Sequence, residues 1–315
     1  DAVLLDEAGC IVVQRAMLAH CGGRMRNRMA ILDLWGGARG RQGGQHPHGD
    51  PVARFRDALG VDFLNYAAAY YPWLHTTMVD EQALGHANII NTDALAALGV
   101  AAEATAATSP LLKTILVQAR RQLNLLPPAA AMAGIYTMVD NTRGVWKAPA
   151  NVSLRGVVSP AVAITHEEQE DLNVTPQGKS INAIRSFAGQ GVLVWGARTL
   201  DGNSLDWRYI NVRRTMIMLE ESCRLAAKAM VFEPNVTGTW VTVKSMIENF
   251  LTDIWKRGGL AGAVPDDAFS VHVGLGETMT PEDIAEGVLR VTVLVAITRP
   301  AEFIEITFQQ SMQKA

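Results

Sequence analysis

Two short stretches near the beginning of the chain carry residue types that could bind a ligand. Gly36-Gly37-Ala38-Arg39-Gly40 is glycine-rich, but it lacks the Lys-Ser/Thr pair with which a phosphate loop reaches the phosphate and its metal. His46 and His48 flank a proline with no cysteine or carboxylate cluster beside them, whereas a zinc site needs about four ligands at fixed spacing. We therefore expect both stretches to be loops, and the chain to use no metal or cofactor.

Asp33 is the best candidate for a catalytic carboxylate. It follows a short apolar run, a position at which many α/β enzymes place an acid, although the same position suits a helix or loop cap. A Gly-x-Ser-x-Gly nucleophile motif does not occur in the sequence. We expect no enzyme activity, and the alternative that stays open is an α/β enzyme with a cleft near Asp33 and Tyr71.

The composition sets broad limits on function. The chain has 315 residues, of which 49% are hydrophobic, and a net charge of −3, so it can form one large or two ordinary domains. The slightly negative charge gives no sign of a nucleic-acid partner. No apolar run approaches the roughly 20 residues that cross a bilayer, so we expect no membrane insertion. Cys10, Cys21 and Cys223 are odd in number and scattered, which favours synthesis in a reducing cytoplasm.

The elements that would position Asp33 and Tyr71 alternate between strand and helix. Met29–Leu34 and Asn65–Leu74 are apolar runs typical of buried strands, and Pro51–Leu59 between them is a helix capped by Asp50. This order favours a parallel α/β layer within residues 1–125.

The second half of the chain begins with short β-rich runs punctuated by glycine. These runs, within residues 181–210, lead into a helix that we expect to open at Asn211, because apolar residues then recur at spacings of three and four. A second long helix is expected over residues 239–256. Strands are expected over residues 269–275 and 287–298, the latter alternating apolar and polar side chains.

Five stretches carry a resemblance to a known family. In chain order they are DNTRGVWKAPAN (140–151), GVLVWGARTL (191–200), WRYINVRRT (207–215), VFEPN (231–235) and ITRPAEFIEITF (297–308). Together they resemble the core of contractile tail sheath proteins, the outer sleeves of contractile phage tails, R-type pyocins, type VI secretion systems and extracellular contractile injection systems. The resemblance covers about residues 140–315 and is looser before them.

The resemblance implies an α/β (α+β) fold with a two-layer core. On this basis residues 1–125 are expected as a peripheral middle domain, 126–150 as a connecting helix and loop, and 151–315 as the assembly core, ending in a strand arm over 302–315. Family members usually carry a segment before the position of Asp1, including an arm that begins with a Pro-Gly-Val-Tyr-like strand. No such motif occurs here, so we expect the sequence to be incomplete at its N-terminus.

The resemblance also implies a mechanical rather than a chemical function. Sheath subunits would stack as hexameric rings around an inner tube protein and contract to drive that tube through a target envelope. The expected partners are other copies of the chain, the inner tube, the baseplate and the terminator or cap proteins. Assembly would take place in the bacterial cytoplasm, and the product would be part of a phage tail or tail-like particle.

Two pairs of residues are candidates for contacts with partner proteins. Arg213 and Arg214 fall near a helix start, where positive charge opposes the helix dipole. An acidic partner surface would explain them, and ordinary surface charge is the alternative. Trp146 and Lys147 lie in a Pro- and Gly-containing stretch and are the second pair, whereas Trp195 is expected to pack in the core.

The C-terminal strand is the candidate link between subunits. Phe303 precedes a strict alternation in which apolar Ile304, Ile306 and Phe308 interleave with polar residues. Pro300 offsets this strand from the one before it. Sheath proteins use terminal arms to add a strand to a neighbouring subunit, so resemblance and pattern agree. The alternative is that this strand pairs within its own subunit.

Overall fold

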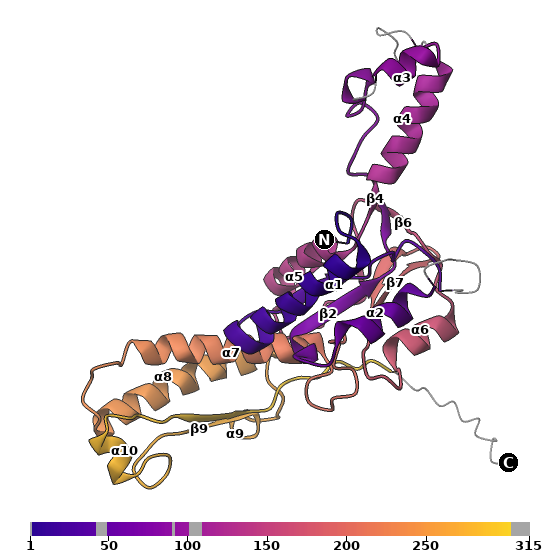
Figure 1. Cartoon of the computed structure of the whole chain (residues 1–315). Helices are drawn as coiled ribbons and strands as arrows, with labels where there is room; N and C mark the ends of the chain where they lie inside the picture. Colours follow the sequence, from indigo (N-terminus) through magenta and orange to yellow (C-terminus); the bar gives the residue numbers. More distant parts are fainter. Residues whose placement is uncertain (1, 42–48, 90–91, 101–108, 304–315) are drawn as a thin grey trace, which may run out of the picture. The chain divides into compact units, whose positions relative to one another are not determined.

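The computed structural model describes most of the chain as two compact units (Figure 1). The described residues are 2–41, 49–89, 92–100 and 109–303. The first unit comprises Asp1–Val145 and Pro149–Ser222, and the second comprises Trp146–Ala148 and Cys223–Ala315. The helix α7, Ile210–Lys228, contributes residues to both units.

A mixed five-stranded sheet forms the centre of the first unit. Its strand order is β1-β2-β7-β8-β5, with β1 parallel to β2, β2 parallel to β7, and the remaining pairs antiparallel. The strands are β1 Ala30–Asp33, β2 Ala67–Tyr71, β7 Asn182–Phe187, β8 Gly191–Trp195 and β5 Val152–Ser153. Parallel pairing at the centre of the sheet explains why β2 has no polar alternation: both of its faces are buried.

Helices cover both faces of this sheet. Ala67, Ala69 and Tyr71 face a core shared with α1, α2 and α6, and Ala68 and Tyr70 face a core shared with α5. The alternating faces of β2 therefore anchor two hydrophobic layers, and its alanines let the layers approach closely. The covering helices are α1 Glu7–Leu18, followed by η1 Ala19–Met25, α2 Pro51–Leu59, α5 Ala129–Arg143 and α6 His166–Asn173; η2 Leu64–Tyr66 leads into β2.

Side-chain caps fix where several helices begin. Asp50 accepts a hydrogen bond from the backbone N–H of Val52 at the start of α2. Thr165 and Glu168 form a reciprocal capping box at the start of α6. The predicted cap at Asp50 is confirmed, because its carboxylate satisfies one of the amides left unpaired at a helix start.

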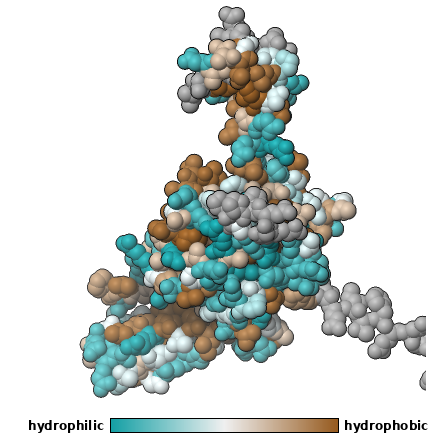
Figure 2. All heavy atoms as spheres, turned by 45° about the vertical axis from the view of Figure 1, so that its right-hand side comes forward, coloured by the Kyte–Doolittle hydropathy of each residue, from teal (hydrophilic) through white to brown (hydrophobic). Residues whose placement is uncertain are grey.

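A smaller sheet supports a helical excursion of the first unit. Its order is β4-β3-β6, with β3 Leu74–Thr76, β4 Leu125–Leu126 and β6 Val157–Pro160. The chain between β3 and β4 carries η3 His86–Asn88, α3 Thr92–Ala97 and α4 Pro110–Leu123, the last capped as predicted by Ser109. Figure 2 shows hydrophobic residues gathered on this excursion, at the top of the view; Leu98, Leu111, Val117 and Leu123 are exposed there.

The second unit packs one long helix on a two-stranded sheet. Val243, Ile247, Leu251 and Ile254 lie along the buried side of α8, Thr237–Lys256. They belong to one stripe because they recur every three or four residues. Strands β9 and β10 pair antiparallel. The remaining elements are α9 Pro265–Ala268, β9 Phe269–His272, α10 Pro281–Ala285 and β10 Thr292–Val295.

The fold class is confirmed, but several expected boundaries differ. The long strand expected over 287–298 is only β10, because the backbone before it bonds elsewhere. The N–H of Val288 donates to the carbonyl of Asp283 at 2.7 Å, and the carbonyl of Arg290 accepts from Thr278 Oγ1 at 2.8 Å. Helix α5 continues to Arg143, so the stretch expected as a loop from residue 140 starts as helix. Trp195 is 37% exposed at the end of β8, so the prediction that it packs in the core was wrong.

The expected division near residues 126–150 does not match the compact units. Strands β1 and β2 come from the part expected to be peripheral, yet they hydrogen-bond into the same sheet as β7 and β8. The physical reason is that β2 is buried on both faces, so the backbone groups along both of its edges need partners, which β1 and β7 supply. Which part of the chain makes the assembly contacts stays a prediction.

Candidate assembly surfaces

Arg213, in the first turn of α7, is buried between two aromatic rings. Its guanidinium carbon lies 3.6 Å from the ring centroid of Trp207 and 4.4 Å from that of Tyr66. Nη1 also donates to the Tyr66 hydroxyl at 3.3 Å. The residue is 5% exposed, and burial lowers its pKa. Arg213 therefore holds α7 against the segment before β2, and little of it is available to a partner protein.

Arg214 connects α7 to α5 through a bidentate ion pair. Its two terminal nitrogens donate to the carboxylate oxygens of Asp140 at 2.7 and 2.5 Å, and its guanidinium lies 4.7 Å from the Tyr136 ring centroid. The hydroxyls of Tyr136 and Tyr70 are 2.8 Å apart in the core. Arg214 thus satisfies its charge within its own subunit, and an additional contact with a partner stays a prediction.

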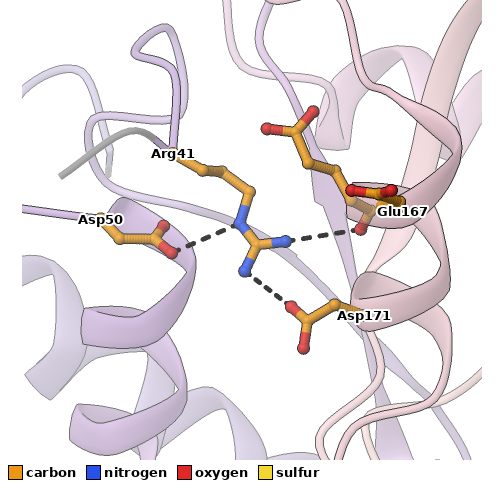
Figure 3. A pocket seen from close by; sticks show the side chains of 5 residues that line it. Arg41, Asp50, Glu167 and Asp171 are labelled. Atoms are coloured by element: carbon orange, nitrogen blue, oxygen red, sulfur yellow. Dashed lines mark hydrogen bonds and ion pairs between the residues drawn. The ribbon is translucent and has the colours of Figure 1, made fainter.

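A charged hollow of about 330 Å³ lies between α2 and α6 (Figure 3). Arg41 Nε pairs with Asp50 at 3.3 Å and Nη2 pairs with Asp171 at 2.6 Å. Arg56, itself buried, reaches Asp171 at 3.0 Å. Burial raises the pKa of Asp171, but hydrogen bonds from Arg41 and Arg56 outweigh it and hold that pKa below its usual range. These ion pairs hold α2 and α6 together within the first unit. Glu167 and Glu168 also line the hollow.

Asp33 and Tyr71, the residues of the enzyme alternative, both have structural partners. The Asp33 carboxylate accepts a hydrogen bond from the N–H of Ala129 at 2.8 Å, at the start of α5. Burial raises its pKa to about 6, against the opposing effect of that hydrogen bond. The Tyr71 hydroxyl donates to the carbonyl of Arg39 at 2.7 Å. Asp33 therefore acts as a helix cap, the second role that its position in the sequence allowed.

The other ligand candidates provide no assembled site among the described residues. No group of three or more His, Cys, Asp or Glu side chains suited to a metal occurs there. His46 and His48 lie outside the described residues. In the glycine stretch, a Cβ at Gly37 would lie 2.7 Å from the Trp73 ring, so this loop serves close packing.

Trp146 and Lys147 lie in the second unit together with Ala148, although the chain on either side of these three residues belongs to the first unit. The Trp146 ring lies beside Gly259: a Cβ added at Gly259 would lie 3.0 Å from the ring. The guanidinium carbon of Arg257 lies over the same ring, 5.1 Å from its centroid. Lys147 Nζ donates to the carbonyl of Ala148 at 3.3 Å. Both side chains are half-buried, and a contact with a partner protein stays a prediction.

The expected linking strand lies mostly outside the described residues. Ile304, Ile306 and Phe308 fall there, and Phe303 is 73% exposed with no strand assigned. The sheet of the second unit consists of β9 and β10 alone among the described strands. Each strand therefore has one edge without a described strand partner, which is the geometry that strand addition requires.

Comparison with known proteins gives this architecture a family. The model for the phage tail sheath protein central domain matches residues 52–200, and that for the phage tail sheath C-terminal domain matches residues 203–311. The sheath chain of an extracellular contractile injection system, the PVC sheath complex in its contracted state, is 30% identical, with a TM-score of 0.64 over 97% of this chain and 81% of that one. The chain belongs to the phage tail sheath protein family.

Further relatives of this sheath family chain support the same assignment. The helical sheath of the anti-feeding prophage (AFP) in its contracted state is 33% identical, with a TM-score of 0.67 over 97% of this chain and 68% of that one. The tail sheath protein of Vibrio phage KVP40 is 31% identical over 138 residues, 43% of this chain and 20% of the relative. That of Burkholderia phage BcepMu is 28% identical over 143 residues, 44% of this chain and 30% of the relative. The matched regions thus cover less than a third of either phage protein.

The predicted resemblance to contractile tail sheath proteins is therefore confirmed. Among the described residues, no helix is both long enough and apolar enough to cross a bilayer. The sequence pattern did not reveal that Arg213 and Arg214 make their contacts mainly within the subunit. Their partners Tyr66 and Asp140 lie far away in the sequence.

Proposed function

We propose that the chain is a structural subunit of the contractile sheath of a phage-tail-like injection machine. Copies stack as hexameric rings around an inner tube and join a baseplate at one end and a terminator or cap at the other. Contraction of this array drives the tube through a target envelope, with no catalytic step in the subunit. Assembly takes place in the bacterial cytoplasm, and the product is a phage tail or a tail-like particle.

The observation that carries this proposal is the pair of sheath-domain matches, which follow each other in order from residue 52 to residue 311. The likeness to sheath structures in the contracted state supports contraction. A chain of the six-fold symmetrised AFP baseplate structure is 33% identical over 98% of this chain and 66% of that one, with a TM-score of 0.68, which supports six-fold rings that meet a baseplate.

The C-terminal arm, residues 302–315, supplies the link between subunits in this proposal. Among the described strands, β9 and β10 pair only with each other, so their outer edges are suited to receive a strand from a neighbouring copy. Backbone hydrogen bonds would give affinity, and alternating side chains would fix the register. Such a link keeps subunits joined while their packing changes between two states. The second unit, together with the part of the first that follows residue 151, would then form the assembly core.

Electron microscopy of negatively stained full-length protein, produced together with the other proteins of its particle, tests the function directly. Long helical sheaths are expected, whereas discrete small oligomers alone would contradict the proposal. Removing residues 302–315 should leave a folded, soluble subunit that no longer polymerises. Full-length sheaths built from the truncated protein would refute the arm. A reconstruction with residues 1–125 against the tube and the C-terminal half outside would refute the placement of the assembly core.

A further inference from the structure

The turn between α7 and α8 carries a fully exposed phenylalanine. Phe232 has a relative exposure of 102%, and its neighbours Val231 and Val236 are also exposed. Its backbone lies in the left-handed region, at φ 74°. A bulky residue seldom adopts this conformation unless the surrounding structure imposes it, and such residues concentrate at functional positions. We call residues 229–236 the hairpin tip.

The hairpin tip is held in place by hydrogen bonds rather than by packing of Phe232. Asn235 Nδ2 donates to the carbonyl of Val288 at 3.1 Å, and Asn235 Oδ1 accepts from Trp240 Nε1 at 2.7 Å. The N–H of Glu233 donates to the carbonyl of Met230 at 3.2 Å. Because the turn is fixed while Phe232 contributes nothing to the core, the ring is a pre-organised projection.

The first unit contains a hollow beside an exposed aromatic ring, Phe63. Its volume is about 360 Å³, and it is lined by Gly22, Arg26, Val61, Phe63, Leu64, Asn65, Tyr66 and Asp201. Phe63 is 39% exposed and packs so closely on the preceding segment that a Cβ at Gly22 would lie 2.5 Å from its own Cβ. The hollow thus offers the exposed Phe63 ring and the edge of the buried Tyr66 within a lining that is more polar than apolar. We call it the socket.

Backbone strain marks both features. The described non-glycine residues with positive φ are Arg26, Phe63, Asn151 and Phe232. Arg26 and Phe63 line the socket, at φ 55° and 56°, and Phe232 is the projection. Strain of this kind persists only where the fold over-determines it. Arg26 takes this conformation as the residue that ends η1, so the positive φ values that suggest a shared contact are those of Phe63 and Phe232.

The charges beside the two features are complementary. Glu233 follows Phe232 directly and is exposed. Arg26 at the socket is exposed, and the exposed Arg24 and Arg28 flank it in the sequence; the socket lining also includes Asp201, which these three arginines outnumber. An acid beside Phe232 and arginines beside the socket would favour the correct orientation of the hairpin tip on the socket. Both surfaces belong to this chain, so the complementary partner is another copy of it.

We propose that Phe232 of one copy inserts into the socket of the next copy, where its ring meets Phe63 and Tyr66 and Glu233 faces Arg26. The two surfaces differ, so the contact is heterologous and propagates into rings or an open helix rather than closing as a dimer. The inference rests on the proposed sheath function and adds to it a contact that does not use the C-terminal arm.

Substitutions at exposed residues test the contact without disturbing the core. Phe232→Ser, Glu233→Arg and Arg26→Glu should each reduce the yield of sheath roughly tenfold or more, as expected for a central aromatic anchor and its ion pair. The combined Glu233→Arg/Arg26→Glu variant should recover most of the yield. Val241→Ser, at an exposed position of α8 outside the hairpin tip, is the matched control and should build normal sheaths.

Cross-linking identifies the occupant of the socket. A full-length variant with Val231→Cys and Val61→Cys, both at exposed positions, keeps the Phe232 ring and, treated with a bismaleimide in assembled sheath, should give a ladder of covalently joined copies. These variants also carry Cys223→Ser, because Cys223 is half-buried whereas Cys10 and Cys21 are buried. Either single introduced cysteine alone should then give no ladder. Circular dichroism of each variant would show whether its subunits remain folded.

The outcomes separate this inference from the function on which it rests. If the wild type builds no sheath with its partners, both are overturned. If the wild type assembles and the Phe232→Ser and Glu233→Arg variants assemble equally well, only the contact is overturned. Loss of sheath without recovery in the charge swap, together with no ladder between copies, would mean that the hairpin tip meets a different protein, which also overturns the proposal.

Discussion

Arg213 offers the sharpest quantitative test of how the first unit is held together. Replacing it with alanine removes cation–π contacts with Trp207 and Tyr66, each about 1–2 kcal/mol in a desolvated position. It also removes the packing of the aliphatic stem, about 1–2 kcal/mol. Relief from burying a charge offsets part of this, on the order of 1–2 kcal/mol. We therefore expect the free energy of unfolding to fall by about 2–3 kcal/mol.

Methionine at the same position separates the charge from the packing. Arg213→Met keeps most of the apolar stem and loses the guanidinium, so we expect it to reduce the free energy of unfolding by about 1 kcal/mol. Urea denaturation of the full-length subunit, followed by circular dichroism, measures both variants. Arg155→Met provides the matched control, because Arg155 is exposed and its replacement should change stability by less than about 0.5 kcal/mol.

Two results would refute this reasoning. If the Arg213→Ala and Arg213→Met variants unfold at the same urea concentration as the Arg155→Met control, the aromatic sandwich contributes no stability. If both variants remain as stable as the wild type but fail to form sheath, Arg213 serves a partner contact, as its place in the sequence suggested, and its burial in the subunit is not the main reason for its presence.

Three further predictions concern single side chains. Asp171→Asn should lower the free energy of unfolding at pH 7 by about 1 kcal/mol. Because the folded pKa of Asp171 is depressed, the stability that this carboxylate contributes is lost as pH falls below about 4. The free energy of unfolding, measured as a function of pH, should therefore fall less steeply in acid for the variant than for the wild type. Asp33 has a raised folded pKa of about 6, so the wild type should lose up to about 3 kcal/mol as pH rises from about 4 to 6, and Asp33→Asn should flatten this dependence in pH-dependent thermal unfolding. Gly259→Ala would place a Cβ 2.6 Å from Ile254 and should cost about 1–3 kcal/mol in calorimetry, whereas Gly238→Ala, with open space around it, should not destabilise the second unit.

Features with a local physical cause were predictable from the sequence. Asp50 and Ser109 were recognised as helix caps because the cap, the proline that follows and the apolar pattern all lie within a few residues. The helix α8 was recognised for the same reason, since the period of its apolar residues is a property of one helix; Val243, Ile247 and Ile254 were expected on its buried side, whereas Leu251 was missed. The family resemblance also depended on short contiguous stretches, which need no knowledge of the fold.

Features that depend on distant partners were not predictable in this way. Arg213 looked like a surface residue because nothing near it in the sequence indicates that Tyr66 will form one wall of its pocket. The short length of β10 follows from backbone hydrogen bonds of Val288 and Arg290 to Asp283 and Thr278, which compete with the strand that the alternation favours. The socket was missed as well, because a left-handed phenylalanine at position 63 has no sequence signature of the kind that glycine provides.

The pairing of β2 with β7 has a consequence for the synthesis of the protein. Asn182 Nδ2 donates to the carbonyl of Ala69 at 3.1 Å, across 113 residues of chain. At about 5–20 residues per second, a ribosome needs roughly 6 to 20 s to make the strand that covers this edge of β2. Throughout that interval the nascent chain displays an alanine- and tyrosine-rich strand with no neighbour on that side. A ribosome that stalls before residue 182 therefore releases a fragment prone to aggregation, and chaperones that bind exposed strands would act on this protein before its second half exists.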